Sequence, residues 1–179
     1  MNEPWKSFLN DLDAQLTGPT EIHCFGGFVV AEQYGLIRTT ADIDVIESHG
    51  TTPAALVALA GKGSDLHKKH KVYVDIVTVA DVPYEYESRL IPVFENEFKN
   101  LRLKAFDRHD LVLAKLGRNI DRDRQDVEAL TNGPGLDVEL LRKRFDEEME
   151  PYIGNPKRER LTLDLWIEII EEIKARKRT

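Results

Sequence analysis

The feature that most constrains the fold is a change of pattern near residue 106. Before it, short apolar or alternating stretches predict strands at residues 21–25, 41–47, 72–79 and 101–106. After it, residues 111–117, 127–130, 138–145 and 161–173 show the three- and four-residue spacing of helices. Strands followed by helices predict an α/β (α+β) fold, with a small mixed sheet, flanking helices and a C-terminal helical layer.

Helices are also predicted within the first part, at residues 5–16, 28–34 and 53–60. No repeat and no long linker interrupts the chain. We therefore expect residues 1–106 to form the α/β core and residues 107–179 a helical extension packed on it, as a single compact unit.

Composition excludes several classes of protein. The chain has 179 residues, a net charge of −7 and one cysteine, Cys24. It is therefore neither disordered nor held by disulfides, and it has no apolar stretch of the roughly 20 residues that cross a bilayer. Acidic residues stand where a signal peptide would be cationic, so we expect a cytoplasmic protein with no membrane partner. The negative charge argues against a nucleic-acid-binding surface all over the protein, but leaves room for a local basic groove.

Acidic residues occur in three Asp-x-Asp pairs, and only their context separates them. One pair lies in a helical pattern, where residues two apart diverge, and another sits among arginines near a helix start, so we expect both to be solvated. Asp42 and Asp44 differ because they lie on a predicted strand, with Ile43 and Val45 pointing to the opposite face. Their carboxylates should project side by side. The two pairs expected at the surface are Asp11/Asp13 and Asp121/Asp123.

A third carboxylate, Asp75, is the single acid of the next predicted strand. Bringing it close to Asp42 and Asp44 would cost roughly 4 kcal/mol per close pair at an effective dielectric of about 20. A positive charge must compensate, and hard oxygen ligands select Mg²⁺ or Mn²⁺. Three acids on two strands are the donor set that a two-metal site uses.

Gly26 and Gly27 separate the first predicted strand from the helix at residues 28–34. Glycine lets a backbone approach a ligand closely, and free N–H groups at a helix start bind phosphate. Taken alone, the pair is equally a tight strand-to-helix turn. Combined with the aspartates, it favours a site for a nucleotide and metal ions.

These motifs resemble a known superfamily. Cys24-Phe25-Gly26-Gly27-Phe28, followed by the segment from Arg38 to Val45, resembles the signature of the DNA polymerase beta-like nucleotidyltransferases. The segments at residues 111–116 and 121–127 are similar to the later lysine and aspartate helices of its minimal branch, which includes the AbiEii-type toxins. Gly27 stands where many members have serine. The resemblance covers about residues 22 to 130 and leaves the remainder unassigned.

The resemblance implies a role for each acid and glycine. Asp42 and Asp44 would hold Mg²⁺ or Mn²⁺ ions that bridge a nucleoside triphosphate. Asp75 would hold the second ion and help deprotonate the acceptor hydroxyl. Gly26 and Gly27 would cradle the β- and γ-phosphates through main-chain N–H groups.

It also implies a set of phosphate-binding residues. Thr39 or Thr40 would donate a hydroxyl, with Arg38 nearby as a counter-charge. Lys115 would neutralise charge on the triphosphate. Asp126 would position Lys115 or a further nucleotide-binding residue, Arg122.

Several of these residues have a simpler interpretation. Lys115 could extend its amine from a half-buried helix to water. Asp126 lies four residues after Arg122, so the two could form an ordinary surface pair, and Arg38 could be a loop charge. Residues 67–71, with two histidines and three lysines, are typical of a solvated basic loop that could also touch a nucleic acid.

Three functions remain open from the sequence. The first is a metal-dependent transferase that moves a nucleoside monophosphate from a triphosphate to an acceptor hydroxyl. The resemblance suggests RNA, such as a tRNA 3′ end, as acceptor, and a toxin with a cognate antitoxin protein as context. The second is a transferase acting on a small molecule, as in antibiotic modification. The third is a non-catalytic module that binds a nucleotide or a partner protein.

Overall fold

The computed structural model describes residues 1–36 and 39–177, so Arg38 lies outside the described residues. The chain divides into two units by its internal contacts. One unit contains residues 1–79 and 90–106, and the other contains residues 80–89 and 107–179. The candidate carboxylates lie in the first unit, and Lys115 and Asp126 lie in the second.

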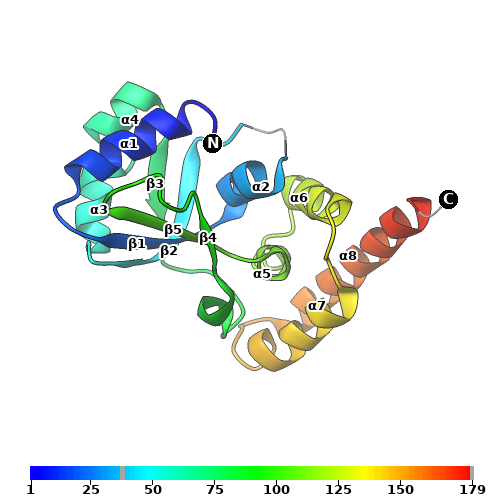
Figure 1. Ribbon diagram of the computed structural model, residues 1–179. Coiled ribbons are helices and arrows are strands. Elements are labelled where there is room, and N and C mark those ends of the chain that lie inside the picture. The colour runs from blue at the N-terminus through cyan, green and yellow to red at the C-terminus, as the bar shows by residue number, and fades with distance from the viewer. Residues whose placement is uncertain (37–38, 178–179) are drawn as a thin grey trace. The chain divides into compact units, whose positions relative to one another are not determined.

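The first unit contains a five-stranded mixed sheet in the order β3-β2-β1-β5-β4 (Figure 1). β1 pairs antiparallel with β2 and parallel with β5, while β2 pairs parallel with β3 and β4 pairs antiparallel with β5. The predicted α/β fold is therefore confirmed. The strands are β1 (Thr20–Phe25), β2 (Asp42–His49), β3 (Tyr73–Ile76), β4 (Ile91–Val93) and β5 (Leu101–Ala105).

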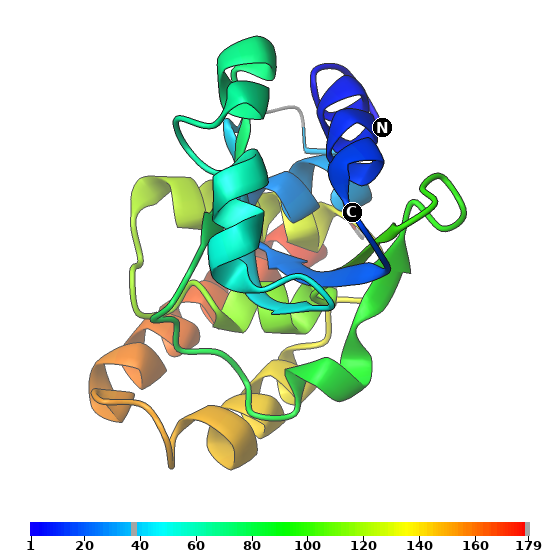
Figure 2. The same cartoon turned by 90° about the vertical axis from the view of Figure 1, so that its left-hand side faces the viewer.

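The described part of this unit has four helices, α1 (Trp5–Gln15), α2 (Gly26–Tyr34), α3 (Pro53–Ala60) and α4 (Asp65–His70). The first three confirm the helices that the sequence predicts. α1 and α4 are neighbours in both views (Figures 1 and 2). They are joined at Asp11, whose carboxylate accepts hydrogen bonds from Lys69 Nζ at 2.6 Å and His70 Nε2 at 2.7 Å.

The basic segment at residues 67–71 is mostly helix, so its assignment as a loop is wrong. Ser64 caps α4 by accepting the N–H of His67 at 3.1 Å, and Leu66 is buried beneath it. A serine cap with one buried leucine is enough for a short helix in this packed context.

Asp11 and Asp13 are not simply solvated, contrary to the expectation from their helical spacing. Asp13 accepts three backbone N–H groups at the start of β5, from Lys99 at 3.1 Å, Asn100 at 2.7 Å and Leu101 at 2.7 Å. Both acids therefore tie α1 to distant parts of the chain.

β3 is shorter than the strand predicted at residues 72–79. The N–H of Val77 still donates to the carbonyl of Val45 at 2.9 Å, but Val79 is 88% exposed. β3 is an edge strand, so the chain leaves the sheet where no further packing surface is available.

The second unit is helical. Its elements are η1 (Tyr86–Arg89), α5 (Arg108–Leu113), α6 (Asp121–Asn132), α7 (Val138–Arg144), the π-helix η2 (Phe145–Met149) and α8 (Pro156–Arg176). The helical pattern after residue 106 is confirmed. The helix expected at residues 111–117 begins earlier, at Arg108, and its hydrogen bonds change after Leu113 to the shorter spacing of a 3₁₀ turn. There, Lys115 N–H donates to Val112 and Leu116 N–H to Leu113, three residues back.

Buried and half-buried charges hold the helices of this unit together. Arg89 binds Asp110 at 3.1 Å and Glu148 at 2.7 Å, and Arg144 binds Asp107 and Asp110 at 2.8 Å each. These bonds link η1, α5, α7 and η2. Among residues 1–36 and 39–177, no helix combines the length and apolar character needed to cross a bilayer.

Candidate active site

The acid strand predicted from the sequence is β2. Ile43 and Val45 are fully buried, while Asp42 and Asp44 are partly exposed on the opposite face. This alternation is the direct result of the two-residue period of a strand. The apolar side chains fix the strand in the core and leave the two carboxylates on one open face.

Asp75 joins this face through the pairing of β2 with β3. The strands run parallel, with Asp44 opposite Asp75 and Asp42 opposite Tyr73. Register partners on neighbouring strands project to the same side of a sheet. The structure therefore gathers Asp42, Asp44 and Asp75 on one face, and Asp75 is the most exposed of the three.

The three acids act together on the hydroxyl of Tyr73. Burial raises the pKa of its hydroxyl, and the Asp42, Asp75 and Asp44 carboxylates raise it further, as does a hydrogen bond with Asp42. All three acids thus act on one phenol. The sequence could have indicated Tyr73, since it lies two residues before Asp75 on the same strand and so shares its face.

The glycine corner lies directly against this acid cluster. Gly26 starts α2 with a φ of +73°, and a Cβ built on it would overlap Asp44 Oδ2. Gly27 is buried in the same first turn, and the N-cap residue Phe25 provides no capping side chain. Because the first N–H groups of a helix have no partner within the helix, those at the start of α2 can bind an anion near Asp44.

Cys24 lies behind the same corner and is fully buried. Burial raises the pKa of its thiol strongly, and the Asp44 carboxylate adds to the effect. The thiol is therefore held protonated and has no role as a nucleophile.

The two predicted threonines differ in position. Thr40 Oγ1 donates to Asp42 Oδ1 at 2.8 Å, so it holds a carboxylate in place. Thr39 is exposed and lines an open pocket with Asn2, Glu3 and Glu32 among others. Arg38 is outside the described residues.

Lys115 and Asp126 form a buried pair in the second unit. Lys115 is 4% exposed and Asp126 is fully buried, with Nζ 2.7 Å from Oδ2. Neither simpler interpretation holds, since Lys115 does not extend to water and Asp126 is not a surface acid. Arg122 lies exposed on α6.

Asp123 completes this pair, although its sequence context suggested a solvated residue. It is fully buried, 3.5 Å from Lys115 Nζ, and it accepts a hydrogen bond from Arg118 Nε at 2.9 Å. Burial opposes ionisation of Asp123, but Arg118, Lys115 and the N–H of Ile120 outweigh it and lower its pKa. The period of α6 offered a signal, because Asp123 and Asp126 lie three residues apart on the face of Val127 and Leu130.

Comparison with protein families decides the class of the molecule. A family model matches residues 9–174, which is nearly the whole chain. The chain belongs to the family described as "Nucleotidyltransferase of unknown function (DUF6036)". Searches of curated proteins and of solved structures found no match. The acid face offers carboxylate oxygens and the glycine corner lies at a helix start, and these are groups that can bind a divalent ion and phosphate.

Proposed function

We propose that this chain is a metal-dependent nucleotidyltransferase, which moves a nucleoside monophosphate from a triphosphate to an acceptor hydroxyl. The observation that carries the proposal is the parallel register of β2 and β3, which sets Asp75 beside Asp44 on the face of Asp42. Family membership supports nucleotidyl transfer in general. The acid cluster supports the metal dependence.

The acid cluster fits Mg²⁺ or Mn²⁺ by its donor set. Asp42, Asp44 and Asp75 offer hard oxygens on one face of the sheet, and all three carboxylates, after burial, help to raise the pKa of Tyr73 beside them. Asp42 and Asp44 would hold the ions that bridge the triphosphate, and Asp75 would hold the second ion. Bound ions would neutralise phosphate charge and lower the pKa of the acceptor hydroxyl.

The chain's own groups would then position the reaction. Gly26 and Gly27 present N–H groups to the β- and γ-phosphates at the start of α2, where an added side chain would displace Asp44. Thr40 keeps Asp42 in place. By the resemblance, Thr39 would donate its hydroxyl to the phosphates, and Arg38 would act as a counter-charge. Positioning and charge stabilisation are the main contributions that a protein makes to this class of reaction.

These groups account for each part of the transfer step. The acceptor oxygen bonds to the α-phosphorus while the bond from that phosphorus to the β-phosphate oxygen breaks, and pyrophosphate leaves. Asp75, which is exposed to an incoming acceptor, would receive the hydroxyl proton. By the family resemblance, Lys115 would neutralise charge on the triphosphate and Asp126 would position Lys115. Arg122 would be a further nucleotide-binding residue.

The acceptor and the biological context come from the resemblance to AbiEii-type toxins. On that basis we propose RNA, such as a tRNA 3′ end, as acceptor, a cognate antitoxin as protein partner, and the cytoplasm as compartment. The basic helix α4 adds little support for RNA. Lys68 is paired with Asp65, and Lys69 and His70 are paired with Asp11.

The test uses the full chain with each of the four α-labelled triphosphates, Mg²⁺ or Mn²⁺, and either total RNA or a small-molecule extract. We expect label in RNA with one preferred triphosphate. Asp44→Asn should abolish transfer, whereas Asp121→Asn, on an acid that is 95% exposed, should not change it.

Each other outcome selects a different function. Label in the small-molecule fraction alone would replace the RNA acceptor. Calorimetric binding of a triphosphate without turnover under either metal would favour the binding module. Transfer that survives Asp44→Asn undiminished would remove these acids from the mechanism.

A further inference from the structure

A second group of metal-ligating side chains lies on the sheet, apart from the aspartates. Glu21 and His23 belong to β1 and His49 ends β2. One ligand atom from each lies within 4.8 Å of those of the other two. The proposed nucleotidyl transfer uses none of them.

The pairing of β1 with β2 explains why they meet. Glu21 is the register partner of His49, and His23 is two residues further along the same strand, hence on the same face. The rings of His23 and His49 pack edge to face with centroids 5.1 Å apart. Residues 28 positions apart in sequence are thereby placed next to each other.

A β-bulge is what turns His49 toward this face. The register shifts between His23 and Cys24, so that Cys24 pairs with Val45 but His23 pairs with Glu47. Ile46 is the extra residue, and the alternation of β2 reverses after it. Without the bulge, Ser48 would share the face of Glu21 and His49 would point to the other side.

The donor set suits a transition metal, and one short contact in the group, a hydrogen bond between Glu21 and His23, already holds two of the donors close together. Glu21 Oε1 is 3.1 Å from His23 Nε2, close to the edge of about 3.3 Å that bonds of about 2.0 Å give in a tetrahedral zinc site. Two imidazoles and one carboxylate favour a borderline ion such as Zn²⁺, whereas the all-oxygen aspartate cluster favours Mg²⁺. His49 is exposed, so its ring has room to turn toward the other two.

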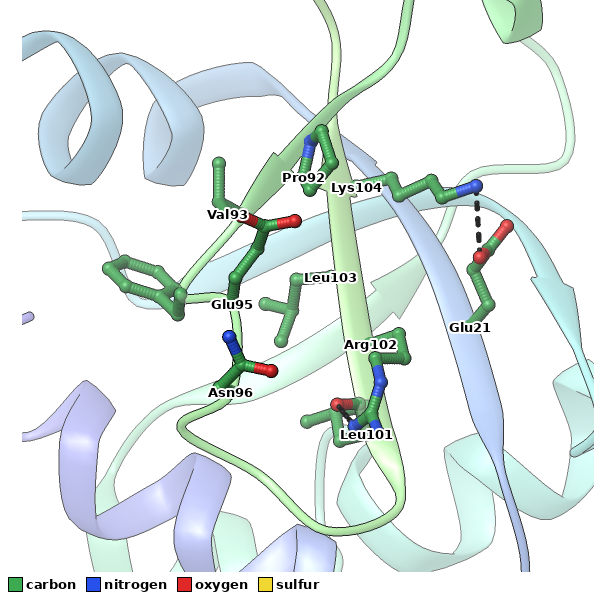
Figure 3. Close-up of a pocket in the computed structure, with 10 residues that line it drawn as sticks. Glu21, Pro92, Val93, Glu95, Asn96, Leu101, Arg102, Leu103 and Lys104 are labelled. Carbon is green, nitrogen blue, oxygen red and sulfur yellow. Dashed lines mark hydrogen bonds and ion pairs between the residues drawn. The ribbon is translucent and has the colours of Figure 1, made fainter.

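The surroundings support a site that keeps one open position. Lys104 Nζ holds the other carboxylate oxygen of Glu21, Oε2, at 3.0 Å, and their side chains point toward each other beside a cavity of about 190 Å³ (Figure 3). Such an outer contact orients a ligating carboxylate. His23 is 3% exposed, but His49 borders solvent, which leaves space for a water or a small ligand.

We propose that Glu21, His23 and His49 form a binding site for one Zn²⁺ ion with three protein ligands and an exchangeable fourth position. The site is distinct from the aspartate cluster and does not depend on the proposed function. Of its three ligands, Glu21 also lines the cavity of Figure 3.

The test is calorimetric titration of the full chain with Zn²⁺ in the presence of excess Mg²⁺, which occupies the hard oxygen ligands. A parallel titration with Co²⁺ reports coordination geometry by its visible absorption. We expect one equivalent to bind, and His49→Ala and Glu21→Gln to weaken binding by at least roughly tenfold. His67→Ala, which removes a histidine outside the site, and Asp44→Asn should bind Zn²⁺ as the wild type does.

Two results would overturn the proposal. One is the absence of a one-to-one Zn²⁺ complex in the wild type. The other is a complex that Asp44→Asn abolishes and His49→Ala leaves intact, since the ion would then lie at the aspartates. His49 is exposed, so its variant folds, and far-ultraviolet circular dichroism of each variant verifies this.

Discussion

Gly26 lies in contact with the Asp44 carboxylate, at the point where strand β1 turns into helix α2. The contact joins two motifs through residues that are 18 positions apart in the sequence. Two features require glycine at position 26. Its φ is +73°, and the Asp44 carboxylate leaves no space for a Cβ.

Gly26→Ala should therefore damage both the fold and the site. The left-handed backbone and the overlap with Asp44 should lower the free energy of unfolding by about 1–3 kcal/mol. Nucleotidyl transfer should fall further than stability explains, because Asp44 must move. Urea denaturation and the transfer assay measure the two effects.

Gly18→Ala is the matched control. A Cβ at Gly18 meets nothing within 4 Å, so its stability and activity should remain those of the wild type. If Gly26→Ala behaved like Gly18→Ala, the close approach of corner and carboxylate would be refuted.

Asp75→Asn should separate stability from function. Without metal, Asp75 repels Asp44 across the parallel pair, so its neutralisation should raise the free energy of unfolding by about 1 kcal/mol. With Mn²⁺ present, the wild type should gain stability from the ion and the variant should gain less. Thermal melts in chelator and in Mn²⁺ measure both changes. A lower melting temperature in chelator would show that Asp75 makes stabilising contacts instead.

The sequence predicted the acid face because a strand's period determines it locally. Asp42 and Asp44 share a face whatever their strand pairs with, and a lone acid in a valine-rich strand marks Asp75. The glycine corner was equally local. What sequence could not supply was the register of β2 against β3, which depends on long-range packing.

Residues whose environment is set by tertiary contacts were missed. Asp13 and Asp123 have the spacing of solvated helix residues, yet one binds backbone N–H groups at β5 and the other is buried against Arg118. His49 reaches Glu21 only because a bulge at Ile46 reverses the alternation of β2. A bulge has no dependable signal in one sequence, so this cluster could not be predicted.

Asp13 should make stability depend on pH. Burial opposes its ionisation, but the N–H groups of Leu101, Asn100 and Lys99 outweigh this and lower its pKa. A lowered folded-state pKa means that Asp13 contributes stability above the unfolded pKa of about 3.9, and that this contribution is lost as pH falls through the folded value.

Asp13→Asn should accordingly cost about 1–3 kcal/mol at pH 7 and progressively less below about pH 3.9. Urea unfolding of variant and wild type at a series of pH values measures the difference. Asp65→Asn, on a carboxylate that is 98% exposed, should show no such trend. A difference independent of pH would mean that Asp13 acts by packing and not by charge.

Lys115→Met should destabilise the protein strongly, since it leaves the buried Asp126 carboxylate without the amine 2.7 Å away. Loss of one partner from a buried ion pair costs about 3–5 kcal/mol, whereas replacing both partners with apolar groups is often close to neutral. The double variant Lys115→Met/Asp126→Leu should therefore recover most of the lost stability in urea denaturation, while Asp123 keeps Arg118. If Lys115 binds the phosphates, this stable double variant should still bind triphosphate more weakly than the wild type does. Recovery of affinity together with stability would restrict Lys115 to a structural role.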